Sequence, residues 1–343
     1  VDFHLSGNLW DALYNLCDRD SWNVDLTFTV SWNGPTSAVT FEIDPPLFHD
    51  FVRLNGKWYP DKPAIIADGE TLDWGTLDQR ASQVANGLRK LGVGAGSSVA
   101  LLMQNCVEYV EVMYGILKAG AVIVPINLAV NEVGIETMLD DANARAVFIT
   151  PDQYERFANR SIGADRHSFL VGGTREGVAD YFAWRNQQSD AQPTWRIGES
   201  DPCNIIYSSG TTGQPKGIKH LYRRRVQSMY ELSLAHRYHF ESISICPIGL
   251  YSNIAWASLF CALIVGGTCV IQSKFETEAW MKAVEDSAVT HTFMVPIQFQ
   301  RVLDDPGFAP SRVASLEAVI SGGAPLFSEL KQRIGREFGC ALI

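Results

Sequence analysis

The sequence lacks the residue spacings that mark metal centres and redox pairs. Its seven cysteines include no CxxC pair, and most lie in apolar runs, which predicts buried thiols in a reducing compartment. Its seven histidines form no HxxxH or HxxE cluster, so we expect no zinc site built by the protein and place His220 at the surface. The cysteines are Cys17, Cys106, Cys203, Cys246, Cys261, Cys269 and Cys340.

Long hydrophobic runs and an excess of positive charge are missing as well. The formal net charge of -10 argues against a broad nucleic-acid surface, although small-anion sites remain compatible with it. The most apolar stretch, Ala255 to Ile271, is interrupted at Gly266 and is too short to span a bilayer, so we expect a buried helix, a turn and a strand. Because no secretory signal opens the chain, we expect a cytoplasmic protein and leave peripheral membrane contact open.

The length and composition are those of a globular protein with more than one packed lobe. The chain has 343 residues, a length above that at which one hydrophobic core usually stops growing. Of its residues, 46% are hydrophobic and 19% are charged, which is ordinary for a globular protein. It begins at Val1 and ends at Ile343 inside an apolar run, and we interpret it as a fragment.

Residues 1–46 differ from the rest and stay unassigned. Leu26 to Trp32 alternates apolar and polar residues, and Asn33-Gly34 offers a tight turn before Ala38 to Ile43, so we expect a β-hairpin.

From residue 47 to residue 343 the pattern alternates strands with helices, which indicates βαβ units and a parallel sheet. The polar segment Asn186 to Ser200 is the expected loop between two α/β halves, the second beginning at Cys203. The segment Gly92 to Gly96 precedes a predicted strand, whereas a dinucleotide-binding fingerprint follows one, and its glycine spacing differs. We interpret it as a helix-to-strand turn. Helices are predicted at Thr76–Leu91, Val107–Lys118, 224–236 and 252–264, and strands at 98–103, 121–125, 144–149, 204–207, 268–271 and 318–321.

The segment Tyr207 to Gly217 combines the residues that a phosphate-binding loop requires. Its glycines let the backbone approach phosphate oxygens, its hydroxyls and N–H groups donate hydrogen bonds, and Lys216 supplies positive charge. It is not a Walker A loop, because Pro215 precedes the lysine and Gly217 follows it.

This string resembles the signature loop of the adenylate-forming superfamily, which includes acyl-CoA synthetases, luciferases and peptide-synthetase adenylation domains. The resemblance covers roughly Leu47 to Ile343. It implies an α/β fold, the large N-terminal domain with two stacked, parallel-type α/β subdomains and additional β-structure, and with the small C-terminal domain absent.

The resemblance also implies site residues. The phosphates of ATP would be held by Ser208, Ser209, Gly210, Thr211, Thr212, Gly213, Lys216 and Gly217. The adenine and acyl pocket would be formed by Tyr251, Ser252, Asn253, Gly322, Gly323, Ala324 and Pro325. Ser252 stands where the family commonly has a histidine, and serine offers neither a planar ring nor a nitrogen that titrates near neutral pH.

The implied reaction is that of an acid–thiol ligase. A hydrophobic carboxylic acid, fatty or aromatic, would react with ATP and Mg²⁺ to give an acyl-adenylate, and coenzyme A would then accept the acyl group. The family's magnesium-coordinating glutamate, ribose-binding aspartate and catalytic lysine do not occur before Ile343, so we expect no metal ligand here and a fragment that is inactive alone. An adenylation domain that loads a carrier protein, a luciferase-like oxidase and a catalytically silent ATP-binding or interaction module stay open as alternatives.

Overall fold

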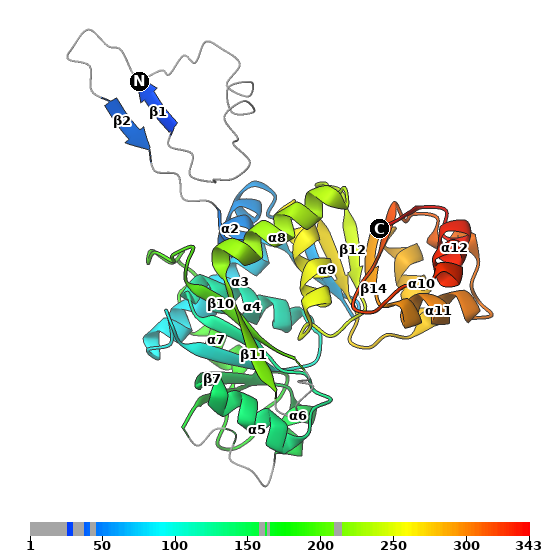
Figure 1. Ribbon diagram of the computed structural model, residues 1–343. Helices are drawn as coiled ribbons and strands as arrows, with labels where there is room; N and C mark the ends of the chain where they lie inside the picture. The colour runs from blue at the N-terminus through cyan, green and yellow to red at the C-terminus, as the bar shows by residue number, and fades with distance from the viewer. Residues whose placement is uncertain (1–25, 30–37, 42–45, 158–161, 163–164, 209–214) are drawn as a thin grey trace. The chain divides into compact units, whose positions relative to one another are not determined.

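The computed structural model describes residues 26–29, 38–41, 46–157, 162, 165–208 and 215–343, in two units, Val1–Pro45 and Pro46–Ile343 (Figure 1). In the first unit, β1 (Leu26–Thr29) and β2 (Ala38–Phe41) pair antiparallel, with Leu26 opposite Phe41. This pairing confirms the strands of the predicted hairpin, whereas the expected turn at Asn33-Gly34 lies outside the described residues.

The second unit contains two seven-stranded, mostly parallel sheets. The first has the strand order β11-β10-β6-β5-β7-β8-β9, and only β10 and β11 pair antiparallel. Its strands are β5 (Ser98–Leu102), β6 (Val122–Pro125), β7 (Ala144–Ile149), β8 (His167–Leu170), β9 (Ala179–Asp180), β10 (Pro202–Ser208) and β11 (Lys216–Leu221).

The second sheet has the order β16-β15-β14-β12-β13-β3-β4, and only β3 and β4 pair antiparallel. Its strands are β3 (Pro63–Ala67), β4 (Glu70–Asp73), β12 (Ile243–Cys246), β13 (Thr268–Ile271), β14 (His291–Met294), β15 (Ala318–Ser321) and β16 (Ala341–Leu342). Two strands that precede the whole first sheet in the sequence therefore complete the second sheet.

Helices fill the space between the sheets and cover their outer faces (Figure 1). Helices α2, α3, α4, α8 and α9 contribute to a central core shared with both sheets; α5 covers the first sheet, and α10, α11 and α12 cover the second. The helices are α2 (Phe48–Trp58), α3 (Trp74–Lys90), α4 (Val107–Ala119), α5 (Glu132–Asp141), α6 (Pro151–Arg156), α7 (Tyr181–Asn186), α8 (Tyr222–Ala235), α9 (Asn253–Ile264), α10 (Thr277–Asp286), α11 (Pro296–Asp304) and α12 (Ser328–Glu337), with a 3-10 turn at Pro310–Val313.

The central strands are buried on both faces. In β5, Val99 and Leu101 point into the central core, whereas Ala100 and Leu102 point to the outer core. A parallel strand covered by helices on both sides reads as a continuous apolar run, which is why the strand predictions were accurate. The predicted fold class, two stacked, mostly parallel α/β layers, is confirmed.

Local signals also fix where the helices begin and end. Asp73 caps α3 by accepting a hydrogen bond from the Thr76 N–H at 2.6 Å. Gly120 ends α4 in the left-handed conformation, with φ of 72°, which favours glycine. Residues 92–96 form the turn between α3 and β5, as predicted.

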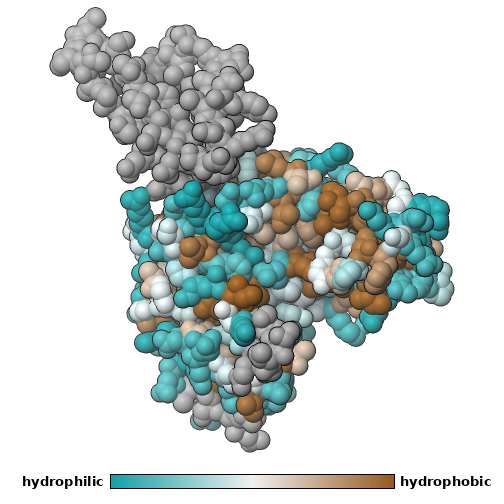
Figure 2. All heavy atoms as spheres, in the orientation of Figure 1, coloured by the Kyte–Doolittle hydropathy of each residue, from teal (hydrophilic) through white to brown (hydrophobic). Residues whose placement is uncertain are grey.

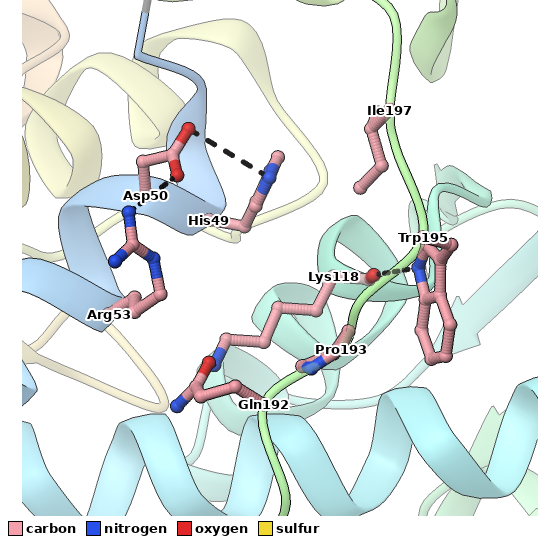
Figure 3. Close-up of a pocket in the computed structure, with 8 residues that line it drawn as sticks. All are labelled: His49, Asp50, Arg53, Lys118, Gln192, Pro193, Trp195 and Ile197. Atoms are coloured by element: carbon pink, nitrogen blue, oxygen red, sulfur yellow. Dashed lines mark hydrogen bonds and ion pairs between the residues drawn. The ribbon is translucent and has the colours of Figure 1, made fainter.

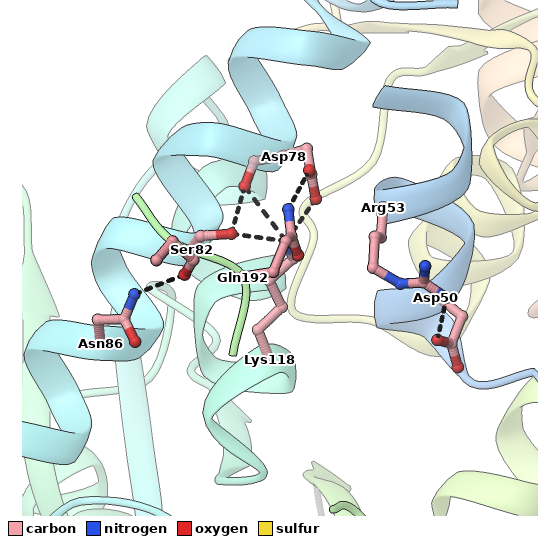
Figure 4. A network of polar contacts seen from close by, with 8 residues as sticks. Asp50, Arg53, Asp78, Ser82, Asn86, Lys118 and Gln192 are labelled. Carbon is pink, nitrogen blue, oxygen red and sulfur yellow. Dashed lines mark hydrogen bonds and ion pairs between the residues drawn. The ribbon is translucent and has the colours of Figure 1, made fainter. Parts of the chain in front are cut away.

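The polar segment Asn186 to Ser200 connects α7 to β10 but does not separate the two sheets. Strand β10 after it pairs with β6, Asn204 lying opposite Ile123, so the expectation of a second half beginning at Cys203 is wrong. The segment is fastened to α3 and α4: Lys118 Nζ donates to Asp78, Ser82 and Gln192 (Figure 4). A local pattern detects a polar connection, but strand pairing decides which sheet follows it.

The apolar stretch from Ala255 to Ile271 folds as most of α9, a turn and β13, as predicted. Within the residues that the structure describes, no helix is long and apolar enough to cross a membrane. On the face drawn in Figure 2, hydrophobic side chains lie among hydrophilic ones. Helix α8 carries two large exposed apolar residues, Tyr230 and Leu234.

Helix α7 is attached to α3 and α4 through one buried carboxylate, Glu111, which is fully buried. Glu111 Oε1 accepts hydrogen bonds from the Tyr181 hydroxyl and from Arg185 Nη1, the latter at 2.5 Å, and Oε2 lies 3.3 Å from Arg80 Nη1. Burial raises the pKa of Tyr181 well above its usual range, and the Glu111 carboxylate raises it further. Both carboxylate oxygens are therefore satisfied without water.

We expect Glu111→Ala to lower the free energy of unfolding by about 3–5 kcal/mol, because it leaves the buried Arg185 guanidinium without its anion. Urea denaturation measures the change. Asp286→Ala is the control, since it breaks only the exposed pair with Lys282 and should leave the midpoint nearly unchanged. Equal midpoints for the two variants would contradict this role of Glu111.

Two buried histidines lie at the amino end of the second sheet. His291 Nε2 donates to the His236 carbonyl oxygen at 3.1 Å, its Nδ1 lies 2.8 Å from Thr290 Oγ1, and its ring stacks on Tyr238. Burial lowers the pKa of both histidines below the ordinary value of 6.5. Nearby, His239 pairs with Glu317 at 3.3 Å in an exposed contact.

Because the folded pKa values of His236 and His291 are depressed, the unfolded chain binds protons more readily. The stability that their neutral forms provide is complete above about pH 6.5 and is lost as the pH falls below it. We expect the urea midpoint to fall from about pH 7.5 to about pH 5.5, and to fall less in His291→Asn. The same pH dependence in both proteins would exclude His291 as a contributor.

Candidate functional site

The strand order of the second sheet contains a topological switch point. Strand β12 lies between β13 and β14, so the connections that leave β12 and β14 run to opposite sides of the sheet. In open parallel sheets, ligands bind outside the carboxyl ends of the strands at such a switch point. The loop that follows β12 begins at Pro247, the segment that follows β14 begins at Val295, and Gln298 Nε2 donates to the Pro247 carbonyl oxygen at 3.3 Å.

The loop after β12 is held by a residue of the other sheet. Asn105, which follows β5 and is 6% exposed, donates from Nδ2 to the carbonyl oxygens of Ile248 at 2.9 Å and Gln272 at 3.0 Å. Its Oδ1 accepts from the Leu250 N–H at 2.9 Å. Trp256 Nε1 donates to the Leu250 carbonyl oxygen at 2.9 Å. Asn105 was not predicted as a site residue, because nothing in the sequence shows which loop it contacts.

Ser252 closes this loop and begins α9. Its Oγ accepts from the Ala255 N–H at 3.3 Å and donates to the Gly249 carbonyl oxygen at 3.1 Å, which makes it the N-cap of the helix. The neighbouring Tyr251 ring lies against Gly249, where an added Cβ would come within 2.2 Å of it. Serine at the family's histidine position is thus used for capping.

The segment after β15 lies against α9. Gly323 has φ of 78°, and a Cβ there would lie 2.4 Å from Cδ1 of Ile254. A Cβ on Gly322 would lie 3.8 Å from the same atom, and Ala324 and Pro325 are exposed. The structure therefore brings the predicted residues 251–253 and 322–323 to the same end of α9.

The predicted phosphate loop connects β10 to β11. Ser208 is paired with Lys216 and Tyr207 with Gly217, so these strands bring the two ends of the loop together. The Tyr207 hydroxyl donates to Asp141 at 2.5 Å, which ties β10 to α5. Lys216 and Gly217 are exposed. Ser209, Gly210, Thr211, Thr212 and Gly213 lie outside the described residues.

Arg225 lies beside the start of α9 and was also missed. It is 7% exposed, its Nη2 donates to Asn253 Oδ1 at 2.8 Å, and its guanidinium lies 4.8 Å from the Trp256 ring centre. Helical spacing could have identified it, because Tyr222, Arg225 and Val226 share the buried face of α8. His220, expected at the surface, is half-buried, with Nδ1 3.2 Å from Asn204 Nδ2, and burial lowers its pKa.

A pocket of about 200 Å³ lies elsewhere, between α2, α4 and the segment before β10 (Figure 3). None of the described site residues predicted from the sequence lines it. Lys118 at its wall is committed to Asp78 and Gln192, and burial lowers its pKa while Asp78 opposes that effect. We therefore assign this pocket to packing. It is lined by His49, Asp50, Arg53, Lys118, Gln192, Pro193, Trp195 and Ile197.

The described cysteines are free, and most of them are buried. Cys203, Cys246, Cys261 and Cys269 are buried free thiols, as predicted, and burial raises the pKa of Cys246 to about 11. Cys106 and Cys340 are partly buried and free, and Cys17 lies outside the described residues. Among the described residues, no three His, Cys, Asp or Glu side chains are grouped to hold a metal ion.

Comparison with known proteins identifies the family. Residues 52–343 match the model of the AMP-binding enzyme family. The chain belongs to this family. It is 30% identical over 280 residues to a feruloyl-CoA synthase of Amycolatopsis sp. and 26% identical over 295 residues to a 4-coumarate–CoA ligase of Pinus taeda. These alignments cover 80% and 83% of the chain, and the chain spans about half the length of the curated relatives it matches, 54% in both cases.

Solved structures of the family share the fold. A long-chain-fatty-acid CoA ligase from Rhodopseudomonas palustris superposes with a TM-score of 0.78 at 25% identity, over 86% of this chain and 74% of that one. The N-terminal domain of FACL13 from Mycobacterium tuberculosis superposes with a TM-score of 0.77 at 23% identity, again over 86% and 74%. The described architecture is that of the N-terminal domain of adenylate-forming enzymes.

We expect Gly323→Ala to lower the free energy of unfolding by about 1–2 kcal/mol, because its φ of 78° is strained for alanine and the new Cβ meets Ile254. Urea denaturation measures the change.

Gly335→Ala is the matched control, since Gly335 lies exposed in α12 with no other atom within 4 Å of an added Cβ. It should raise the free energy of unfolding by about 0.5–1 kcal/mol. Shortening the neighbour as well, in the double variant Gly323→Ala and Ile254→Ala, should remove the clash with the new Cβ; a coupling energy of zero between the two changes would argue against this contact.

Proposed function

We propose that the full-length protein activates a hydrophobic carboxylic acid, fatty or aromatic, with ATP to an acyl-adenylate and then forms a thioester with coenzyme A. Family membership is the observation that carries this proposal, together with the phosphate-loop string at residues 207–217. The names of the relatives support it, since they include a feruloyl-CoA synthase and 4-coumarate–CoA ligases.

The chemistry explains why no protein nucleophile is required. A carboxylate is already anionic at neutral pH, so catalysis depends on aligning two anions and neutralising their charge. Donors from residues 208–213, with Lys216 and Gly217, would surround the β- and γ-phosphates. The exposed position of Lys216 at the start of β11 fits that role.

Mg²⁺ would enter with the nucleotide and be held by phosphate oxygens. The glutamate that the resemblance assigns to magnesium does not occur before Ile343. ATP, Mg²⁺ and coenzyme A are therefore the expected cofactors and co-substrates of the complete protein.

Residues near the carboxyl ends of β12 and β15 support an apolar acid. Ile254 lies against Gly322 and Gly323. Such a lining would suit an aliphatic chain or an aromatic ring. Tyr251, Asn253, Ala324 and Pro325 would complete the wall at the carboxyl ends of β12 and β15.

A carrier protein is the alternative acceptor. A fatty acid–[acyl-carrier-protein] ligase of Streptomyces coeruleorubidus is 24% identical over 279 residues, and triostin synthetase I of Streptomyces triostinicus is 27% identical over 303 residues. Activation of the acid would be the same in either case, and only the thiol that receives the acyl group would differ.

The test is carboxylate-dependent formation of AMP and pyrophosphate by the full-length protein, across fatty and aromatic acids, with and without coenzyme A. We expect pyrophosphate release with at least one apolar acid, and a thioester when coenzyme A is added. Transfer only to a carrier protein would favour the alternative acceptor, and no release with any acid would argue for a silent module.

Lys216→Ala should lower ATP-dependent pyrophosphate release by about 10- to 100-fold, because a charge-assisted contact to phosphate is lost. Lys219→Ala, three residues further along the exposed strand β11, is the matched control and should retain activity. Equal losses in both variants would show a general effect on the strand rather than a phosphate contact.

A further inference from the structure

Arg225 is a buried cation for which the described chain supplies no anion. Its Nη2 donates to the neutral amide oxygen of Asn253, and its Nε is buried without a hydrogen-bond partner. Among ionisable groups, only the Cys203 thiol raises the pKa of Arg225. Burial raises the pKa of this thiol to about 12, so it is neutral at pH 7. Residues 209–214, which are not described, contain neither Asp nor Glu.

Two other arginines of this fold are paired with carboxylates. Arg185, 6% exposed, lies 2.5 Å from Glu111, and Arg156 lies 2.8 Å from Glu132. Burial lowers the pKa of Arg225 to about 10, so the guanidinium is still charged at pH 7. A buried charge without a counter-ion destabilises a folded protein, and such a destabilising group is typical of a binding site rather than of a scaffold.

The position of Arg225 connects it to the acid pocket. Its partner Asn253 is exposed and opens α9, and the next residue, Ile254, contacts the glycines after β15. The guanidinium therefore reaches the first residue of α9, next to the residues proposed to bind the acid. The N-terminal end of a helix adds positive potential at the same place, and the Trp256 ring supports the flat guanidinium.

We propose that Arg225 is a specificity-determining residue that binds a second carboxylate of the acid substrate, separate from the carboxylate that is activated. This inference rests on the function proposed above and narrows its substrate class to largely apolar acids with a distal carboxylate. The planar fork of a guanidinium matches a carboxylate with two parallel hydrogen bonds, which neither a lysine nor an amide provides.

The test compares matched acids in the full-length protein: hexanedioate with hexanoate, octanedioate with octanoate, and terephthalate with benzoate. Pyrophosphate release gives kcat/KM for each acid. We expect the parent to prefer the dicarboxylate of at least one pair, and Arg225→Leu to lower that preference by about 10- to 100-fold. Arg225→Lys should retain part of it, and Arg224→Leu, an exposed neighbour on α8, should retain all of it.

The melting temperature distinguishes a role of Arg225 in substrate recognition from a purely structural role. Because Arg225 lacks an anion, we expect Arg225→Leu to melt at the same temperature as the parent or higher. A lower melting temperature together with an unchanged dicarboxylate preference would make Arg225 a structural anchor for Asn253 and overturn the proposal. If the leucine variant fails to fold, Arg225→Gln and Arg225→Lys are compared instead.

Binding is also measured without turnover, so that failure of the proposed function and failure of this inference can be told apart. Calorimetric titration of each dicarboxylate, without ATP, should show weaker binding to Arg225→Leu than to the parent. If no acid gives pyrophosphate release, the proposed enzyme function is contradicted, and the role of Arg225 is then judged from the binding data. Equal dicarboxylate binding by both proteins, or a loss of affinity for coenzyme A alone, would overturn the role of Arg225.

Discussion

The carboxamide of Asn105 joins the two sheets at the edge where ligands bind in parallel α/β folds. It follows the central strand of the first sheet, and its three hydrogen bonds go to backbone groups after β12 and β13 of the second sheet. A buried amide that satisfies three backbone groups leaves little freedom to the loop it holds. The positions of Tyr251 and Ser252 depend on this contact, since both belong to that loop.

Buried polar groups elsewhere divide into two kinds. Glu111 and Lys118 have their partners within the chain, and they fasten α7 and the segment before β10 to α3 and α4. Arg225 has only the amide oxygen of Asn253 and an aromatic ring. The satisfied networks make the scaffold rigid, whereas the guanidinium at the start of α9 is placed where a substrate anion can complete it.

The four helices and six strands that were predicted lie close to their positions in the structure, because buried parallel strands and amphipathic helices each have a short-range pattern. Other elements, such as β3, β4 and α7, were not predicted. The expectation of a new α/β half at Cys203 failed, since β10 pairs with β6 and the pairing of strands far apart in sequence leaves no local signal. The run Arg223-Arg224-Arg225 looks like one charged surface, yet the third arginine points inward. Only the helical spacing from Tyr222 distinguishes it.

The sequence by itself determined the local chemistry: a glycine- and hydroxyl-rich loop with Lys216, and buried strands that could form only a covered parallel sheet. Tertiary structure decided which residues act together. In the folded protein β3 and β4 belong to the second sheet, Ser252 caps α9, and Arg225 donates a hydrogen bond to Asn253. The reason is physical: backbone preferences extend over a few residues, whereas contacts between sheets and helices depend on how the whole core packs.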